Sequence, residues 1–172
     1  DNDFSDYVTI AYSAIGVPLW TNYTRGPGGG HAIATAIAVD NSGNIFVTGE
    51  SASDYMTVAY TGAGVALWTN RYNGGGSDYA RAIAVDKRNG TVFVTGYSYN
   101  NNDIDYATVA YSNSGSPLWT NRYHGMGGSD MPRGIAVDGD GNVIVTGISY
   151  RGSTNEFATI AYSGAGLALW TN

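Results

Sequence analysis

The sequence repeats itself with a period of about fifty residues, and this repetition constrains the fold more than any other feature. The tetrapeptide Leu-Trp-Thr-Asn occurs four times, and its tryptophans are 48, 51 and 51 residues apart. The tripeptides Ala-Val-Asp and Val-Thr-Gly recur between them in that order, followed by an Ala-Tyr pair. A fixed period of this size is typical of solenoids, propellers and arrays. The repeated tryptophans are Trp20, Trp68, Trp119 and Trp170.

Each period predicts four short β-strands joined by tight turns. The stretches are rich in Val, Ile, Thr and Tyr and are bounded by Gly, Asn and Ser, with no helical pattern. The turn between the first two strands carries residues that tolerate positive φ, as in 40–44 and 138–142, which favours hairpins and an antiparallel meander. In the middle copy the predicted strands are 81–86, 92–96, 105–111 and 116–122.

The size of the side chains orders the strands from an axis outwards. The first strand alternates alanine with Ile or Val, as in 36–39 and 82–85, whereas the fourth strand carries the tryptophan. Wedge-shaped sheets leave little room near an axis and more at the perimeter, so this taper predicts a β-propeller rather than a sandwich or a straight solenoid. The identical placement of the four tryptophans favours packing between blades over an aromatic platform for sugars.

A family resemblance follows from three motifs. They are Ala-Ile-Ala-Val-Asp-x-x-Gly-Asn-x-x-Val-Thr-Gly, then Asp-Tyr-x-Thr-[Ile/Val]-Ala-Tyr, then Leu-Trp-Thr-Asn-Arg-Tyr. This order resembles the bacterial SBBP repeat, named for seven-bladed β-propellers, and is similar to NHL-type blades. The resemblance covers nearly the whole chain and implies a propeller in a large, often surface-associated bacterial protein. It implies almost nothing about activity.

The predicted blades do not add up to a closed ring. Residues 1–22 form an outer half-blade, and complete blades are expected at 31–71, 77–122 and 129–172, which gives 3.5 blades. Of seven hairpins four are outer and three inner, so two copies would leave two outer hairpins without inner partners. Closed propellers typically contain four to eight blades. We expect the chain to be a segment of a longer propeller or to be completed by other blades, from the same longer chain or from other copies.

Charge and composition narrow the possible partners. The net charge is −6, Lys87 is the sole lysine and the arginines are scattered, so nucleic acid is an unfavoured partner. No apolar run is long enough to cross a bilayer. Cysteine is absent, which excludes disulfides but fits several compartments. The acidic, lysine-poor, Asn/Gly/Ser/Thr/Tyr-rich composition favours an extracellular or cell-surface location.

The segments that differ between copies are the candidates for binding. The loops between the second and third strands are expected at 50–53, 97–104 and 148–155, on the same end as the glycine-rich blade-to-blade loops. Variable loops on a rigid scaffold commonly carry binding, although unconstrained surface variation is an equal alternative. The candidate ligand contacts in these loops are Tyr97, Tyr99, Tyr150 and Arg151.

An acid and a base vary together at the start of the inner strands. Asp78 and Arg81 match Asp130 and Arg133, whereas the first copy has alanine and threonine there. A salt bridge, or hydrogen bonds to loop amides, is the favoured reading. The functional alternative is a polar-ligand contact near the mouth of the axis, where guanidinium donors suit carboxylates, sulfates or sugars.

Metal and catalytic signals are weak. Asp138 and Asp140 begin a stretch like a calcium loop, but a strand follows, so a simple turn is favoured and no metal or cofactor is predicted. His31 and His124 are isolated in glycine loops, and no nucleophile–base order is legible. Carboxylate pairs for glycoside chemistry stay open. An enzyme is therefore less favoured than a non-enzyme.

Three functional hypotheses remain. The first is a non-catalytic binding or scaffolding propeller segment that holds a protein or polymer partner on its loop-bearing end. The second is a lectin with a sugar site in or between blades, although Tyr97 and Tyr150 do not coincide in the aligned loops. The third is a catalytic propeller whose essential groups lie in other blades.

Overall fold

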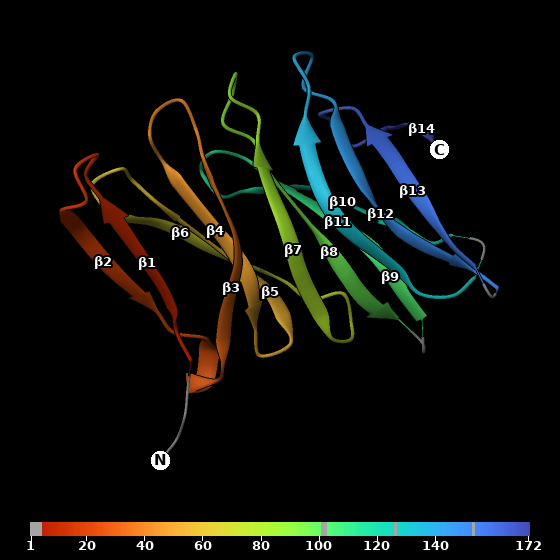
Figure 1. The fold of residues 1–172 in the computed structure, drawn as a ribbon, viewed down its shortest axis with the longest axis horizontal. Helices are drawn as coiled ribbons and strands as arrows, with labels where there is room; N and C mark the ends of the chain where they lie inside the picture. The colour runs from red at the N-terminus through yellow and green to blue at the C-terminus, as the bar shows by residue number, and fades with distance from the viewer. Residues whose placement is uncertain (1–4, 101–102, 126, 153) are drawn as a thin grey trace.

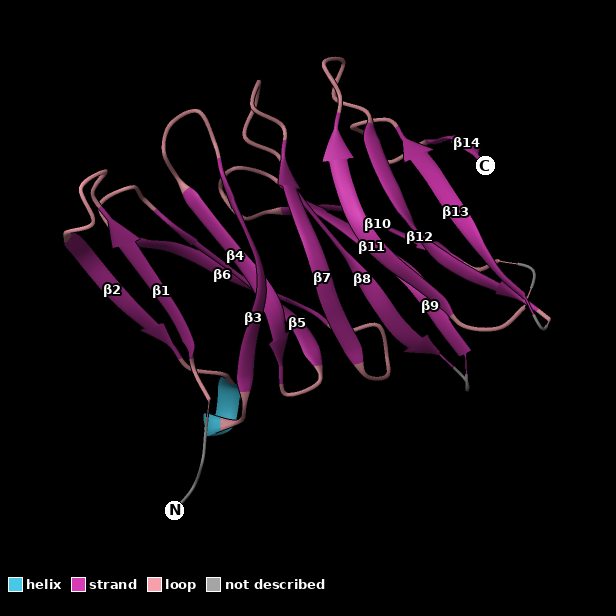
Figure 2. Ribbon diagram, in the orientation of Figure 1, coloured by secondary structure: helices cyan, strands magenta, loops and turns pink. Residues whose placement is uncertain are grey.

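The computed structural model describes residues 5–100, 103–125, 127–152 and 154–172, and in this part the chain is built of β-strands with one short 3₁₀ turn at Pro27–Gly29 (Figure 2). None of the described residues forms a helix that is long and apolar enough to span a membrane. The strands are β1 (Tyr7–Tyr12), β2 (Pro18–Thr24), β3 (Ala32–Val39), β4 (Ile45–Ser51), β5 (Asp54–Tyr60), β6 (Ala66–Tyr72), β7 (Asp78–Val85), β8 (Val92–Asn100), β9 (Asp103–Tyr111), β10 (Pro117–Tyr123), β11 (Asp130–Val137), β12 (Val143–Arg151), β13 (Thr154–Tyr162) and β14 (Ala168–Thr171).

The strands form one two-stranded sheet and three four-stranded sheets. Each sheet is an antiparallel meander, in the orders β1-β2, β3-β4-β5-β6, β7-β8-β9-β10 and β11-β12-β13-β14. The sheets stand side by side along the chain like the blades of a fan (Figure 1). The predicted all-β propeller segment of about three and a half blades is confirmed. We refer below to the half-blade (β1-β2) and to blades 1, 2 and 3.

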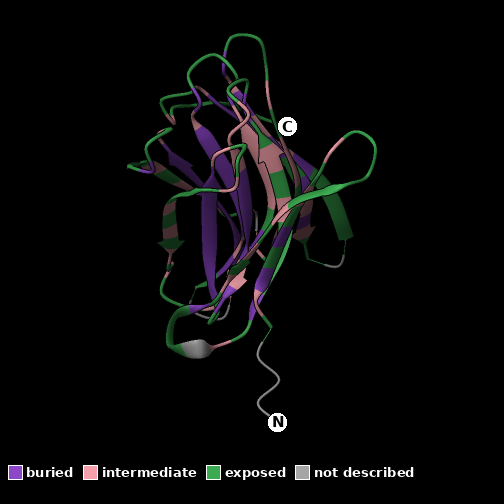
Figure 3. Cartoon of the chain, turned by 90° about the vertical axis from the view of Figure 1, so that its left-hand side faces the viewer, coloured by how far each residue is buried: buried purple, intermediate pink, exposed green. Residues whose placement is uncertain are grey.

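The core lies between neighbouring blades rather than within one blade. One cluster joins Phe46 of blade 1 to Val94 and Val109 of blade 2, and the next joins Phe93 of blade 2 to Val145 of blade 3. Figure 3 shows the buried strands in the interior with exposed turns around them. A blade that has neighbours on both sides is covered on both faces. Its strands are therefore apolar on both sides instead of alternating between apolar and polar residues.

A tyrosine and a glycine of the repeat interlock adjacent blades. The Tyr55 hydroxyl of blade 1 donates to the carbonyl oxygen of Ala107 in blade 2, 3.1 Å away. A Cβ added to Gly96 would lie 2.7 Å from that hydroxyl and 2.1 Å from the carbonyl oxygen of Tyr79, so the position has no room for a side chain. Tyr7 and Tyr106 donate across the other two interfaces in the same way.

The repeated Trp and Asn side chains bind the outer turn of the following blade. Trp68 donates from Nε1 to the carbonyl oxygen of Asn113, and its ring lies against Gly115, whose φ is +87°. Asn70 donates to the carbonyl oxygen of Gly115. Trp20 and Trp119 make the equivalent contacts, whereas Trp170 of the last blade is half-exposed. The repeat motif Leu-Trp-Thr-Asn is therefore a blade-to-blade contact in three of its four copies.

Two segments expected to be loops are strands instead. β8 and β9 stay paired up to Asn100 and Asp103, and β12 and β13 up to Arg151 and Thr154. The expectation of eight-residue loops at 97–104 and 148–155 is thus wrong. Tyr, Ile and Ser alternate through these stretches and form cross-strand pairs, which favours continued pairing over a loop. Asn101 and Asn102, also assigned to that loop, lie outside the described residues.

Candidate functional site

The blade-to-blade segments 25–31, 73–77, 124–125 and 127–129 lie at the same edge of the blades as the ends of β4, β8 and β12, and we call this edge the loop edge (Figure 1). Three backbone hydrogen bonds connect the two sets of segments. Ala52 donates to His31, Asp78 donates to Ser53, and Tyr99 donates to Ser77. The loop edge is therefore one continuous surface, opposite the edge that carries the turns at 40–44, 86–91 and 138–142.

Asp78 and Asp130 hold the blade-to-blade segments from inside. Both carboxylates are fully buried, and the Oδ2 atom of each accepts a 2.6 Å hydrogen bond from a loop amide, that of Gly74 or Gly125. Burial raises the pKa of Asp78 above its ordinary value. The role seen here is the one favoured above, hydrogen bonding to loop amides. In the half-blade-to-blade-1 interface Ala32 takes this place.

The salt bridge that was the other favoured alternative for these residues does not form. Arg81 and Arg133 occupy β-bulges of β7 and β11 and are exposed, whereas Asp78 and Asp130 point into the interior. Successive side chains of a strand point to opposite faces, so residues three apart already face opposite ways. Each arginine also holds the unpaired position of a bulge. Among the described residues, neither arginine forms an ion pair with its aspartate.

Arg81 instead joins a cluster of tyrosines on β7 and β8. Its Nη2 atom donates to the Tyr97 hydroxyl at 2.8 Å, and its Cζ atom lies 4.9 Å from the centroid of the Tyr97 ring. Tyr79 lies directly opposite Tyr97, with ring centroids 5.0 Å apart, and Tyr99 meets both rings edge-on at 6.3 and 6.1 Å. We call Tyr79, Arg81, Tyr97 and Tyr99 the tyrosine–arginine cluster.

This cluster occurs in blade 2 and has no counterpart in the neighbouring blades. The cross-strand pair that corresponds to Tyr79 and Tyr97 is Ile33 with Glu50 in blade 1, and Met131 with Ile148 in blade 3. Tyr150 and Arg151 lie at the end of β12, where Tyr150 packs against Gly128 and Arg151 is exposed. Tyr79 was not among the residues predicted from the sequence. Its place opposite Tyr97 becomes visible only once the strand register is known.

A second polar cluster of blade 2 lies at the same edge. Arg122 donates from Nη2 to Oδ2 of Asp105 at 2.9 Å and from Nη1 to Oγ of Ser98 at 2.8 Å. His124, expected to be isolated, has Nδ1 2.9 Å from Oδ1 of Asp105 and 3.6 Å from Oδ2 of Asp103. The hydrogen bond to Asp105 raises the pKa of His124. The expectation that His124 is isolated was wrong, because β9 and β10 run side by side and bring His124 next to Asp105.

The equivalent aspartates of the other blades have different partners. In blade 1 Asp54 accepts from Arg71 at 2.8 Å and from Asn73 at 3.3 Å. In the half-blade Asp6 lies 3.5 Å from Arg25. The aspartate is thus present in all three units. The residue at the position of His124 differs, since it is Asn73 in blade 1 and Arg25 in the half-blade.

The weak metal candidates Asp138 and Asp140 lie in a turn on the opposite edge. Oδ1 of Asp138 accepts from the backbone amides of Asp140 and Asn142, and Oδ2 accepts from the Asn142 side chain. These hydrogen bonds lower the pKa of Asp138, that from the Asn142 side chain most strongly. Asp40 accepts the same set of hydrogen bonds in blade 1, so the residues act as turn formers.

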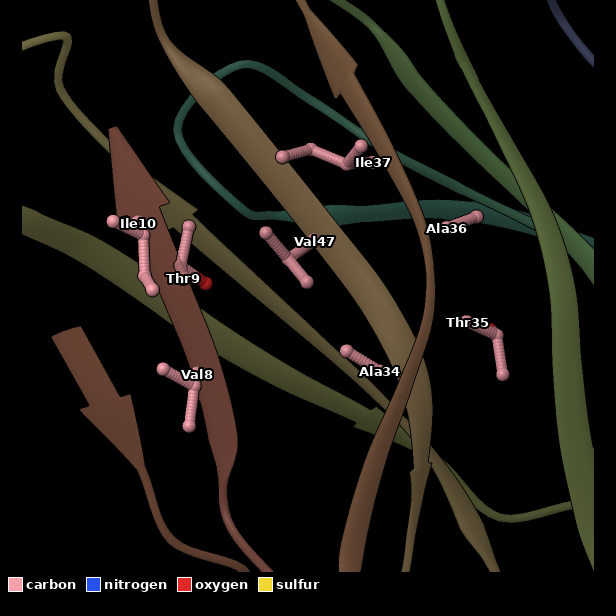
Figure 4. A pocket seen from close by; sticks show the side chains of 8 residues that line it. All are labelled: Val8, Thr9, Ile10, Ala34, Thr35, Ala36, Ile37 and Val47. Carbon is pink, nitrogen blue, oxygen red and sulfur yellow. The ribbon is translucent and has the colours of Figure 1, made fainter. Parts of the chain in front are cut away.

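An apolar groove of about 320 Å³ lies between the half-blade and blade 1. Residues 8–10 of β1 line it on one side, and residues 34–37 of β3 together with Val47 of β4 line it on the other (Figure 4). β1 pairs with β2 on one side and has a free edge on the other, whereas the third strand of each complete blade is paired on both sides. The groove is the place that an inner hairpin occupies in a complete blade.

Comparison with known proteins gives one family match, over part of the chain. Residues 26–55, which span the first blade-to-blade segment, β3 and β4, match the SBBP family, described as a beta-propeller repeat. Residues 26–55 are therefore similar to an SBBP β-propeller repeat. The motifs of this repeat recur in the two blades that follow, which agrees with the resemblance described above. No curated protein matches the chain in sequence.

Solved structures support the propeller-like fold of this chain and show the fold alone. A protein of unknown function from Bacteroides caccae aligns over 98% of this chain with a TM-score of 0.55 and 12% identity. A structure described as the eukaryotic initiation factor aligns over 98% with a TM-score of 0.57 and 7% identity. The chain spans 58% and 43% of these two proteins. Identities this low show a shared fold and leave function to the residues of the site.

Proposed function

We propose that this chain is a non-catalytic binding segment of a β-propeller and that its loop edge contacts a protein or polymer partner through the tyrosine–arginine cluster. The observation that carries the proposal is the contrast between blades. Blades 1 and 2 share their interface contacts, yet blade 2 has Tyr79 and Tyr97 in place of Ile33 and Glu50. The arginine recurs in blade 3 as Arg133, but there Met131 and Ile148 replace the two tyrosines. Residues that differ on a shared scaffold are the natural carriers of binding.

The chemistry of the cluster suits a partner that carries carboxylates. Arg81 donates one hydrogen bond within the described residues, to Tyr97, and a guanidinium has five N–H donors in a planar fork. Stacked tyrosines offer rigid, amphipathic area at low entropic cost, and both tyrosine and arginine are enriched where interfaces gain most of their energy. An acidic peptide or an acidic polymer therefore matches the cluster better than a purely apolar ligand.

Binding arrays test this proposal. The labelled protein would be applied to an array of acidic peptides and to a glycan array that includes uronic acids. A matched variant combines Arg81→Thr with Tyr99→Ala, the residues of blade 1 at these positions. Saturable binding that the variant loses by at least about tenfold is expected. Absence of any binder on both arrays, or equal binding by the variant, would contradict the proposal.

A lectin is the second candidate, and the grouping of three tyrosine rings favours it. Aromatic faces pack against the apolar faces of sugars, and Arg81 would supply the polar contact. The glycan array separates the two candidates. Binding to neutral glycans with no binding to acidic peptides selects the lectin, and the opposite result selects a protein partner.

The groove beside β1 supports a second part of the proposal, namely that further blades complete this segment. An inner hairpin of the same repeat would pair with the free edge of β1, and a preceding blade would cover Val8 and Ile10, which are both nearly half-exposed. Light scattering measures this directly, because an isolated chain has a mass of 18.0 kDa. A stable monomer of that mass, with no tendency to associate, would overturn it. The acidic, lysine-poor composition supports placing the assembled protein outside the cell or at its surface.

A further inference from the structure

We propose that Asp103, Asp105 and His124 of blade 2 form a binding site for a divalent transition-metal ion such as Zn²⁺. The three side chains come from the start of β9 and from the residue that follows β10. One ligand atom from each residue lies within 4.8 Å of the other two. This site is independent of the tyrosine–arginine cluster and of the partner proposed for it.

The separations between the ligand atoms fit a metal ion. Nδ1 of His124 is 2.9 Å from Oδ1 of Asp105 and 3.6 Å from Oδ2 of Asp103. Zinc binds imidazole nitrogen and carboxylate oxygen at about 2.0–2.2 Å, so two ligands of a tetrahedral ion lie roughly 3.3 Å apart. The observed values bracket this separation, and small rotations of the side chains would suffice to admit the ion.

Each carboxylate has one oxygen held by the protein and presents the other to the site. Oδ2 of Asp105 accepts hydrogen bonds from Nε and Nη2 of Arg122, which leaves Oδ1 facing His124. Oδ1 of Asp103 accepts from the backbone amide of Ile104, which leaves Oδ2 facing His124. Hydrogen bonds to the outer oxygens of ligating carboxylates orient them in metal sites.

Exposure of the site leaves room for exchange and for water ligands. The side chain of Asp105 is 8% exposed, whereas those of Asp103 and His124 are 31% and 55% exposed. Three protein ligands with one open side are the arrangement of sites that keep a water on the ion. The guanidinium of Arg122 opposes a cation, while the carboxylate of Asp130 adds negative charge near His124. The three carboxylates outweigh the one arginine around the site.

At the equivalent described positions, blade 1 and the half-blade do not offer this donor set. In blade 1 Asp54 has Asn73 in place of the histidine, and in the half-blade Asp6 has Arg25. An amide is a weaker ligand for Zn²⁺ than an imidazole, and a guanidinium excludes a cation. Within the described residues the three-ligand cluster is therefore confined to blade 2. Blade 1 supplies a natural template for removing it.

Calorimetric titration of the metal-stripped chain with Zn²⁺ tests the proposal, with Co²⁺ as a spectroscopic probe of the ligands. We expect one ion per chain and a visible cobalt spectrum. His124→Asn copies blade 1 and should keep the fold, as circular dichroism would verify, while losing at least about tenfold in affinity. Asp103→Asn keeps the acceptor for Ile104 and should lose affinity to a similar degree. Asn73→Ala, the matched change in blade 1, should bind as the wild type does.

Competition with protons provides a second readout. The metal binds deprotonated ligands, so protons compete with it and affinity should fall as the pH is lowered. Absence of saturable binding of Zn²⁺ and Co²⁺ would overturn the proposal. So would binding that His124→Asn leaves unchanged, because the ion would then lie elsewhere, for example at His31. Repeating the arrays with a chelator keeps this result separate from the proposed partner binding.

Discussion

The interfaces between blades and the loop edge of the same blades differ in how far they repeat. At each interface a tyrosine hydroxyl, a tryptophan Nε1 and an asparagine amide donate to backbone oxygens of the next blade. At the loop edge, the cross-strand pair Ile33 with Glu50 becomes Tyr79 with Tyr97 one blade later. Backbone acceptors do not depend on the partner's sequence, so the interface can be copied unchanged. The residues of the loop edge can then differ between blades, and we propose that they carry binding.

The largest effect is expected where the interface has no spare volume. Gly96→Ala would place its Cβ 2.1 Å from the carbonyl oxygen of Tyr79 and 2.7 Å from the Tyr55 hydroxyl. We expect a loss of about 3 kcal/mol in the free energy of unfolding, measured with urea. Gly134→Ala is the control, because its Cβ would meet Thr146 at an ordinary 3.8 Å. Equal stabilities of the two variants would contradict the packing described here.

Removal of one interface hydrogen bond should have the next largest effect. Tyr55→Phe leaves the buried carbonyl oxygen of Ala107 without the hydroxyl donor, and we expect a loss of about 1–2 kcal/mol. Tyr99→Phe at the loop edge should change stability by less than about 0.5 kcal/mol. Thermal or urea unfolding of both variants measures the difference. A larger loss from Tyr99→Phe would reverse the comparison between interface and edge.

The repeat explains how much of this the sequence could predict. The repeat predicted the strands, their antiparallel order and the number of blades, because residues shared by all copies have the same structural role in each copy. The contact of Trp68 with the next blade is an example, because packing between blades was predicted from its repetition. Hairpin length was misjudged at 97–104, since asparagines in the middle of the segment resemble a loop while the flanking residues continue to pair.

Features confined to one blade were harder to predict. Tyr79 meets Tyr97, and His124 meets Asp105, across strands, and neither contact follows from spacing along the chain. Both contacts depend on the register of the paired strands, which becomes visible only in the structure. Among the described residues Asp78 and Arg81 do not form the salt bridge that was one alternative, because residues three apart on a strand point to opposite faces. Asp78 accepts a hydrogen bond from the Gly74 amide instead, as the other alternative had it.

A smaller gain is expected from a strained turn at the loop edge. Ala52 and Ser53 join β4 to β5 with φ values of 50° and 63°, which side chains other than Asn and Gly adopt at a cost. The double change Ala52→Asn and Ser53→Gly should therefore raise the free energy of unfolding by about 1 kcal/mol. Differential scanning calorimetry would show it as a higher Tm. A lower Tm would mean that these side chains, and not the backbone, matter at the turn.

The smallest effect concerns pH. The folded-state pKa of His124 is raised by Asp105, so the contact stabilises the fold fully below the unfolded pKa of about 6.5 and ceases to do so as the pH rises through the folded value. His124→Asn should lack this component. Urea unfolding between pH 5 and 8 in the presence of a chelator would measure it. Parallel pH profiles for the wild type and the variant would contradict it.

The central claim is that the interfaces between blades carry stability and the loop edge carries binding. Measuring stability and affinity together in two variants tests it most directly. The ligand is the strongest binder from the arrays. Arg81→Thr with Tyr99→Ala should lose at least about tenfold in affinity and keep its free energy of unfolding within about 0.5 kcal/mol. Tyr55→Phe should lose about 1–2 kcal/mol of stability and keep its affinity while folded. Loss of both properties together in either variant would contradict the account.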